Sequence, residues 1–273
     1  MYFITVSEMF GTSGKKVAQG VAKALNYTFY GEEELLKAAE KMGFLKDIQR
    51  LDEKGPSFFE RFFTEKPKVY LDRLQSVIYE VAQKGDAVFF GRGSQLLLNS
   101  FDCALHVLIT GSMEKRIQRA MEENRVSREV AEKMIHTYDH ERRGFVRFAF
   151  DQDWLNPDLY DLILNMDKLS IDSAVKMVMD AAKSDEIKAC GIDSVKALGK
   201  LSLQRKVEAA FLEAGIVSPY LFITVEEEDT VRCFGLANSE DEKAKIEETA
   251  KKIQGVRRVI NDLTVLRGAV GGV

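Results

Sequence analysis

The sequence predicts an α/β fold, with a parallel sheet flanked by helices, followed by a second, small α+β domain. Two observations carry this prediction. Over the first 183 residues, short apolar runs alternate with helical stretches, which is typical of strands joined by crossover helices. Near residue 185 this pattern gives way to a polar segment, and a self-contained series of helix, strand, strand, helix and strand follows it.

The larger part is expected to hold parallel strands at four apolar runs, residues 2–6, 87–90, 105–109 and 161–164. Helices are expected between them, for example at residues 15–25, 70–83, 114–123 and 128–148. Parallel strands are apolar along their whole length because helices cover both faces of the sheet. In such sheets ligands bind beyond the carboxyl ends of the strands, so the residues that follow each strand are the candidate site.

The smaller part is predicted to begin with a helix whose apolar face includes Leu203, Val207 and Phe211 and which ends at Gly215. Two strands, residues 220–225 and 230–236, flank an acidic turn, as expected of a hairpin. Ser239 is placed to cap a second helix, and a last strand spans residues 256–266. We therefore expect one domain at residues 1–183, a linker at 184–198 and a second domain at 199–273. We also expect a homo-oligomer, with the strand at 230–236 as a sheet edge that pairs with another chain.

Composition narrows the class of protein. The chain has 273 residues, of which 45% are hydrophobic and 30% charged, as in an ordinary globular protein. Its formal net charge is −4, and neither part has the basic excess with which proteins bind nucleic acid. Cys103, Cys190 and Cys233 are far apart, and they indicate neither a disulfide framework nor a zinc site. With no apolar run long enough to span a bilayer and no secretory leader at Met1, the expected location is the cytoplasm.

The first candidate site is the loop from Phe10 to Lys15, between the first strand and the first helix. Small residues let backbone N–H groups approach a phosphate, the helix start adds its positive dipole, and a lysine here can reach the terminal phosphates. The loop is an abridged G-x-x-x-x-G-K-[ST] pattern, with Met9 in place of the first glycine and Lys16 in place of the magnesium-binding hydroxyl. The alternative is a plain strand-to-helix turn. The predicted phosphate-binding residues are Gly11, Thr12, Ser13, Gly14, Lys15 and Lys16.

Arginines at two further places are predicted to contact anions. Arg92 lies between two glycines directly after the strand at 87–90, where its planar guanidinium can reach a phosphate, and the alternative is a structural arginine paired to a helix end. Phosphoryl transfer needs positive groups around the migrating phosphoryl, which arginines on a mobile helical segment can supply. The candidates on the two long helices are Arg116, Arg119, Arg142, Arg143 and Arg147, and the alternative for some of them is a surface ion pair.

Taken in order, these motifs resemble those of the cytidylate kinase-like proteins, a branch of the P-loop nucleoside monophosphate kinases. The resemblance covers about residues 1–182 and is carried by Ile4-Thr5-Val6-Ser7, Phe10 to Gly14, Gly91-Arg92-Gly93, Asp139-His140-Glu141-Arg142, Arg147-Phe148, Asp153-Trp154, Asn156-Pro157 and Tyr160 to Asn165. It implies a five-stranded parallel P-loop sheet whose loop at residues 11–16 holds ATP phosphates. It also implies that residues 26–68, with the aromatic cluster at 58–63, form the insertion that binds the monophosphate.

The same resemblance implies an activity, ATP-dependent phosphoryl transfer to a nucleoside monophosphate, with CMP or dCMP as the acceptor and ATP and Mg²⁺ as cofactors. Lys15, Arg142 and Arg147 are then the expected catalytic residues. Arg116 and Arg119 join the loop in binding ATP, and Arg92 and Arg143 bind the acceptor. No residue is assigned as a protein ligand of a metal.

The C-terminal residues resemble a BON domain, with Gly235 as a mid-strand glycine and the run from Gly255 to Asp262 as the closing signature. Such a domain implies a phospholipid or protein partner. The alternative to an enzyme is therefore a catalytically inactive nucleotide-binding regulator that acts through its BON-like domain. The residue at position 16 favours this alternative, and the retained arginines oppose it.

Overall fold

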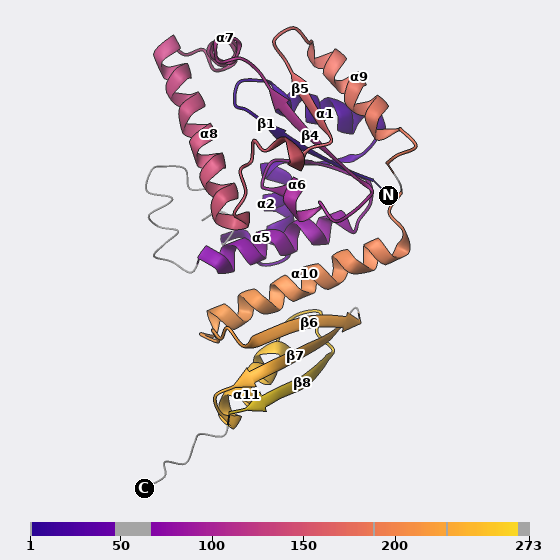
Figure 1. Cartoon of the computed structure of the whole chain (residues 1–273), viewed down its shortest axis with the longest axis vertical. Coiled ribbons are helices and arrows are strands. Elements are labelled where there is room, and N and C mark those ends of the chain that lie inside the picture. The colour runs from indigo at the N-terminus through magenta and orange to yellow at the C-terminus, as the bar shows by residue number, and fades with distance from the viewer. Residues whose placement is uncertain (1, 47–66, 188, 228, 267–273) are drawn as a thin grey trace. The chain divides into compact units, whose positions relative to one another are not determined.

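The computed structural model describes residues 2–46, 67–187, 189–227 and 229–266 (Figure 1). Five parallel strands form one sheet in the order β2-β3-β1-β4-β5, which confirms the predicted parallel α/β fold. The strands are β1 (Phe3–Glu8), β2 (Thr28–Tyr30), β3 (Ala87–Phe90), β4 (Ala104–Thr110) and β5 (Leu162–Asn165). The residue pattern missed β2 because it is three residues long and none of the three is fully buried.

Helices follow the strands of this sheet along the chain. Their bounds are α1 (Gly14–Leu25), α2 (Glu32–Lys41), α5 (Pro67–Ala82), α6 (Ser94–Leu97), α7 (Met113–Asn124), α8 (Arg128–Phe150) and α9 (Ile171–Ala182), with a short 3-10 helix at Pro157–Leu159. The hydroxyls of Ser127 and Ser170 accept backbone N–H bonds at the starts of α8 and α9. These caps fix where both helices begin.

The sheet is buried on two faces because alternate strand residues pack in opposite directions. On one face, Val6 and Val107 join a core with side chains of α1 and α9. On the other face, Leu108 packs with Val146 of α8 and with the fully buried Trp154. The carboxyl ends of β1, β4 and β5 are thereby held at one edge, next to the starts of α1, α7 and α9.

The C-terminal elements follow the predicted order and form a small mixed sheet. They are α10 (Ile192–Glu213), β6 (Leu221–Glu227), β7 (Thr230–Ala237), α11 (Glu240–Lys251) and β8 (Arg258–Val265). Strand β7 pairs antiparallel with β6 and parallel with β8. The expectation that residues 230–236 form a sheet edge is therefore wrong, because β8 adds to the far side of β7. The edges of this sheet are β6 and β8, and a homo-oligomer stays a prediction.

Helix α10 is longer than predicted. It begins at Ile192, so residues 192–198 of the expected linker are helical. Its residues Leu203, Val207 and Phe211 join the core of the small sheet, as predicted. The Ser202 hydroxyl donates to the carbonyl oxygen of Ser76 in α5 at 3.1 Å.

The chain forms two compact units. The first consists of Met1–Leu35 and Lys84–Gly191, and the second consists of Leu36–Gln83 and Ile192–Val273. Helix α5 therefore groups with α10 and the small sheet, although it lies far from them in sequence. The polar contacts of α5 with α10 give a physical reason for this grouping. The domain limits 1–183 and 199–273 stay predictions.

One cysteine pair was not predicted. Cys103, just before β4, and Cys190, just before α10, form a disulfide whose Cα atoms are 5.1 Å apart. Their separation of 87 residues hides this proximity in the sequence. Cys233 is a buried free thiol, and burial raises its pKa to about 12. Within the described ranges, no helix has both the length and the apolar character needed to cross a membrane.

Candidate functional site

The loop between β1 and α1 is a close-fitting turn. Gly11 has a φ of +84°, and a side chain there would lie 2.6 Å from the carbonyl oxygen of Arg116. Ser13 also adopts the left-handed conformation, with a φ of 60°. The Thr12 hydroxyl donates to the carbonyl oxygen of Met9 at 2.8 Å, which closes the turn. Helix α1 begins at Gly14, so the backbone N–H groups of its first turn lie at this loop, which is the arrangement that phosphate binding requires.

The carboxylate of Glu8 lies at this helix start. Its Oε2 atom accepts a hydrogen bond from the backbone N–H of Lys15 at 3.2 Å. A Cβ atom at Gly14 would lie 2.7 Å from the same oxygen, so a residue with a side chain would not fit beside it. Burial raises the pKa of the Glu8 carboxyl, and the charge of Arg142 opposes this shift. Glu8 was not among the predicted site residues, although an acidic residue at the end of an apolar strand is a visible signal.

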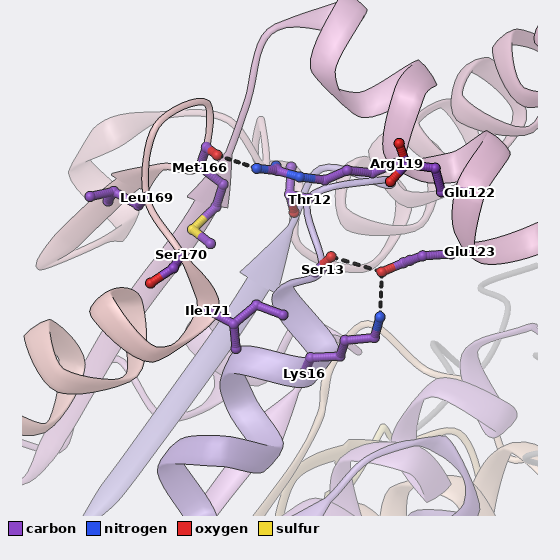
Figure 2. A pocket seen from close by; sticks show the side chains of 10 residues that line it. All are labelled: Thr12, Ser13, Lys16, Arg119, Glu122, Glu123, Met166, Leu169, Ser170 and Ile171. Carbon is purple, nitrogen blue, oxygen red and sulfur yellow. Dashed lines mark hydrogen bonds and ion pairs between the residues drawn. The ribbon is translucent and has the colours of Figure 1, made fainter.

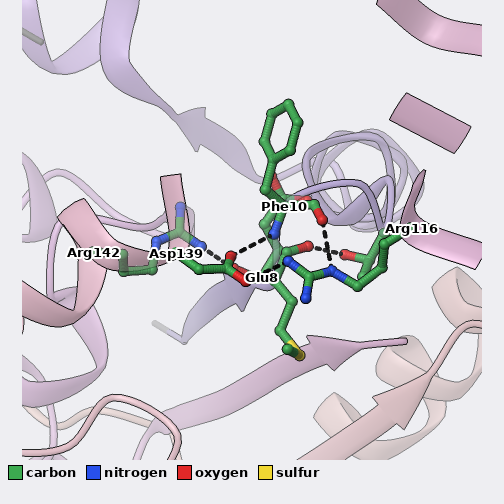
Figure 3. Close-up of polar contacts among 7 residues, drawn as sticks. Glu8, Phe10, Arg116, Asp139 and Arg142 are labelled. Carbon is green, nitrogen blue, oxygen red and sulfur yellow. Dashed lines mark hydrogen bonds and ion pairs between the residues drawn. The ribbon is translucent and has the colours of Figure 1, made fainter. Parts of the chain in front are cut away.

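Helices α7 and α8 each send an arginine to the backbone of this loop (Figure 3). The guanidinium of Arg142 donates to the carbonyl oxygen of Glu8. Arg116 donates from Nε to the carbonyl oxygen of Phe10 at 2.7 Å and forms an ion pair with Asp139. The same Asp139 carboxylate accepts the backbone N–H of Phe10 at 3.1 Å. Arg116 is thus engaged by the loop backbone and by Asp139, which makes it a positioning residue for the loop.

A cavity of about 340 Å³ lies beside the loop (Figure 2). This volume is at the lower end of the range of about 300–1,000 Å³ typical of small-molecule sites. Arg119 spans it and donates to the carbonyl oxygen of Met166. Glu123 accepts hydrogen bonds from Lys16 Nζ at 2.6 Å and from Ser13 Oγ at 2.9 Å. The lining residues come from the loop and α1, from α7, and from the segment after β5: Thr12, Ser13, Lys16, Arg119, Glu122, Glu123, Met166, Leu169, Ser170 and Ile171.

The structure brings together most of the predicted donor-side residues. The loop at 11–16, Arg116 and Arg119, which were predicted to bind ATP, lie at the carboxyl end of β1 or around the cavity. Arg142, which was predicted as a catalytic residue, also lies at the carboxyl end of β1. The side chain of Lys15 is exposed at the start of α1. Sequence reasoning missed Glu123 and the residues after β5, because only the fold places α7 and β5 beside the loop.

The residues predicted to bind the acceptor, Arg92 and Arg143, and the predicted catalytic residue Arg147 lie farther apart. Arg92 follows β3, and its guanidinium lies 3.8 Å from the carboxylate of Glu32. Arg143 and Arg147 are exposed on α8, and Arg147, whose side chain is 73% exposed, lies 3.9 Å from Asp151. The structure does not bring either residue to the cavity. The aromatic cluster at 58–63 lies outside the described residues.

The loop lacks the hydroxyl that the P-loop pattern places after the lysine to bind magnesium. Lys16 stands where the binding pattern has a hydroxyl, and its ammonium pairs with Glu123. The hydroxyls of Thr12 and Ser13 donate to Met9 and to Glu123. Across the described residues, no group of three His, Cys, Asp or Glu side chains is arranged to hold a metal ion.

Comparison with known protein families identifies the family to which the larger part of the chain belongs. The model of the cytidylate kinase-like family matches residues 3–168, more than half of the sequence. The chain belongs to this family. The model of the BON domain matches residues 201–267, so both resemblances identified from the sequence are confirmed. No curated protein matches the chain.

Two solved structures match most of the larger part of the chain. An uncharacterized protein from Eubacterium ventriosum ATCC 27560 is 20% identical, and the match covers 67% of this chain and 99% of that one with a TM-score of 0.54. Shikimate kinase from Bacteroides thetaiotaomicron is 14% identical over 67% of this chain and 99% of its own, with a TM-score of 0.43. The fold is a five-stranded parallel sheet flanked by helices, with an added small α+β domain, as predicted.

Proposed function

We propose that this chain transfers the γ-phosphoryl group of ATP to a nucleoside monophosphate, with CMP or dCMP as the acceptor. One observation carries the proposal. In a member of the cytidylate kinase-like family, the glycine-rich turn at residues 11–16 opens beside a cavity that Arg119 spans. This combination provides backbone amides for phosphates and an adjoining space for the rest of a nucleotide.

The donor side would work by charge neutralisation. The N–H groups at the start of α1 and the exposed ammonium of Lys15 would bind the phosphates of ATP, and Arg119 would line the adjoining nucleotide site. The phosphoryl group passes through a loose transition state with charge on its oxygens, so positioned donors lower the barrier without a covalent intermediate.

The acceptor side would rest on arginines from other elements. Arg92 follows a different strand from the loop, so it would bind the acceptor phosphate and leave ATP to the loop. Arg142 already lies at the end of β1, whereas Arg143 and Arg147 would reach the reactants only on closure of α8. The two reacting phosphates would then be held in line for direct transfer.

A specific observation favours a second candidate, a catalytically inactive nucleotide-binding regulator. Lys16 replaces the expected hydroxyl and is paired with Glu123. Such a protein would bind ATP and act through its BON domain on a phospholipid or protein partner.

An assay of ADP release separates the two candidates. The full-length protein would be tested with ATP, Mg²⁺ and each of CMP, dCMP, UMP, AMP and GMP. Turnover that is fastest with CMP or dCMP is the expected result. Measurable ATP binding without turnover on any acceptor would reject the kinase and leave the regulator.

A further inference from the structure

The turn proposed to bind phosphate already holds a carboxyl group of the protein itself. The Glu8 carboxylate accepts the backbone N–H of Lys15 at 3.2 Å, at the first turn of α1. In a phosphate-binding loop this N–H is one of the donors that a bound phosphate needs. The carboxylate therefore occupies a position for which ATP has to compete.

The surroundings of Glu8 hold it in this position. Its backbone ends β1 and is fixed there by the bond from Arg142 to its carbonyl oxygen. The space that its carboxylate fills exists because Gly14 has no side chain, since a Cβ atom there would lie 2.6 Å from the Cβ of Glu8. The carboxylate and the turn therefore fit each other closely.

A phosphate and this carboxylate would not share the turn. Glu8 lies near a second acid, Glu123, whose charge already disfavours its ionised form. A phosphate beside it would add further like charge at a partly buried position, where repulsion is less screened than in bulk water. Donor binding thus requires that the Glu8 side chain swing out of the turn.

We propose that Glu8 is a built-in competitor of ATP, an autoinhibitory carboxylate that occupies the phosphate-binding amides of the loop and lowers the affinity for the donor. The inference rests on the proposed function, because it takes the turn at residues 11–16 to be the donor site. It deepens that function by assigning a residue that sets how much ATP is needed.

Titration calorimetry with ATP plus Mg²⁺, and separately with inorganic pyrophosphate, tests this on the full-length protein. Glu8→Ala empties the position, whereas Glu8→Gln keeps an acceptor for the Lys15 N–H but removes the charge. Glu33→Ala is the matched control, because it removes one exposed carboxylate of α2 in the same compact unit. Thermal unfolding verifies that each variant is folded.

The expected result is that Glu8→Ala binds both ligands at least about tenfold more tightly, because a charge-assisted hydrogen bond no longer has to be broken. Glu8→Gln should fall in between, and Glu33→Ala should stay within about twofold, as expected for a screened surface charge. Unchanged or weaker binding by Glu8→Ala, with the wild type binding ATP, would overturn the role of Glu8 and leave the proposed function intact. Tighter binding by Glu8→Ala without turnover in any form would support Glu8 as the competitor and overturn the kinase. No binding by any form would overturn both.

Discussion

Arg142 of helix α8 donates a hydrogen bond to the backbone carbonyl of Glu8, the last residue of β1. Its guanidinium carbon lies 5.4 Å from the centre of the Trp154 ring, which is fully buried. Helix α8 is thereby tied to the strand that leads into the turn at residues 11–16. Movement of α8 and the position of the turn are therefore physically linked.

This link predicts different effects for two arginines of α8. Arg142→Ala should lower kcat/KM by about 100-fold, because it removes both a charge and a support of the turn. Arg147→Ala should lower kcat with little change in the KM for ATP, since Arg147 is exposed and would act only on closure. Steady-state kinetics of both variants give the comparison. Wild-type kinetics for Arg142→Ala would contradict the link.

Arg92 should separate the acceptor from the donor. Arg92→Ala is expected to weaken CMP binding by about 10- to 100-fold, because a charge-assisted contact to one phosphate is lost. ATP binding should be unchanged, because the turn at residues 11–16 follows a different strand. Calorimetry with each ligand measures both affinities, with Glu32→Gln as a control for loss of the nearby ion pair. Equal weakening of both ligands would mean that Arg92 is structural.

Asp72 on α5 should make stability depend on pH. Its carboxyl is buried, and burial together with the negative charge of Glu208 raises its pKa to about 7. The positive charges of Arg205, whose guanidinium lies 3.6 Å away, and of Lys68 oppose this shift. An unfolded aspartate has a pKa of about 3.9, so between about pH 4 and 7 the folded state holds a proton that the unfolded state has lost. The free energy of unfolding should therefore fall as the pH rises through this window, by at most about 1.4 kcal/mol per pH unit.

Asp72→Asn provides the test, because the amide stays neutral at every pH. Denaturant unfolding of both proteins at pH 5, 6, 7 and 8 should show the wild type losing stability relative to the variant as the pH rises. Parallel pH profiles for the two proteins would show that Asp72 titrates normally.

The Cys103–Cys190 disulfide predicts the number of reactive thiols. Unfolded without reductant, the protein should present one thiol, that of Cys233, and it should present three after reduction. In the folded protein Cys233 should resist alkylation, because burial raises its pKa to about 12 and keeps the thiol protonated. Thiol titration measures both states, and three thiols before reduction would rule out the disulfide.

The sequence predicted the features that depend on local patterns. Apolar runs between helical stretches gave the parallel sheet, because buried parallel strands have no polar face. Small residues followed by Lys15 located the turn, since phosphate-binding amides need close backbone approach. The edge position assigned to residues 230–236 failed because it depends on where β8 pairs, which no local pattern records. The contact of Glu8 with the Lys15 amide likewise depends on how the chain turns after β1.

Direct detection of the product tests the central claim most directly. Full-length protein would be incubated with ATP, Mg²⁺ and CMP, and ³¹P NMR would follow the formation of CDP and ADP. The account predicts equal amounts of both products, with formation slowed by about 100-fold or more in Lys15→Ala, whose exposed side chain can be removed without unfolding the chain. If no CDP forms from CMP, and no diphosphate forms from dCMP or the other monophosphates, the account is contradicted. It is also contradicted if Lys15→Ala forms CDP at the wild-type rate.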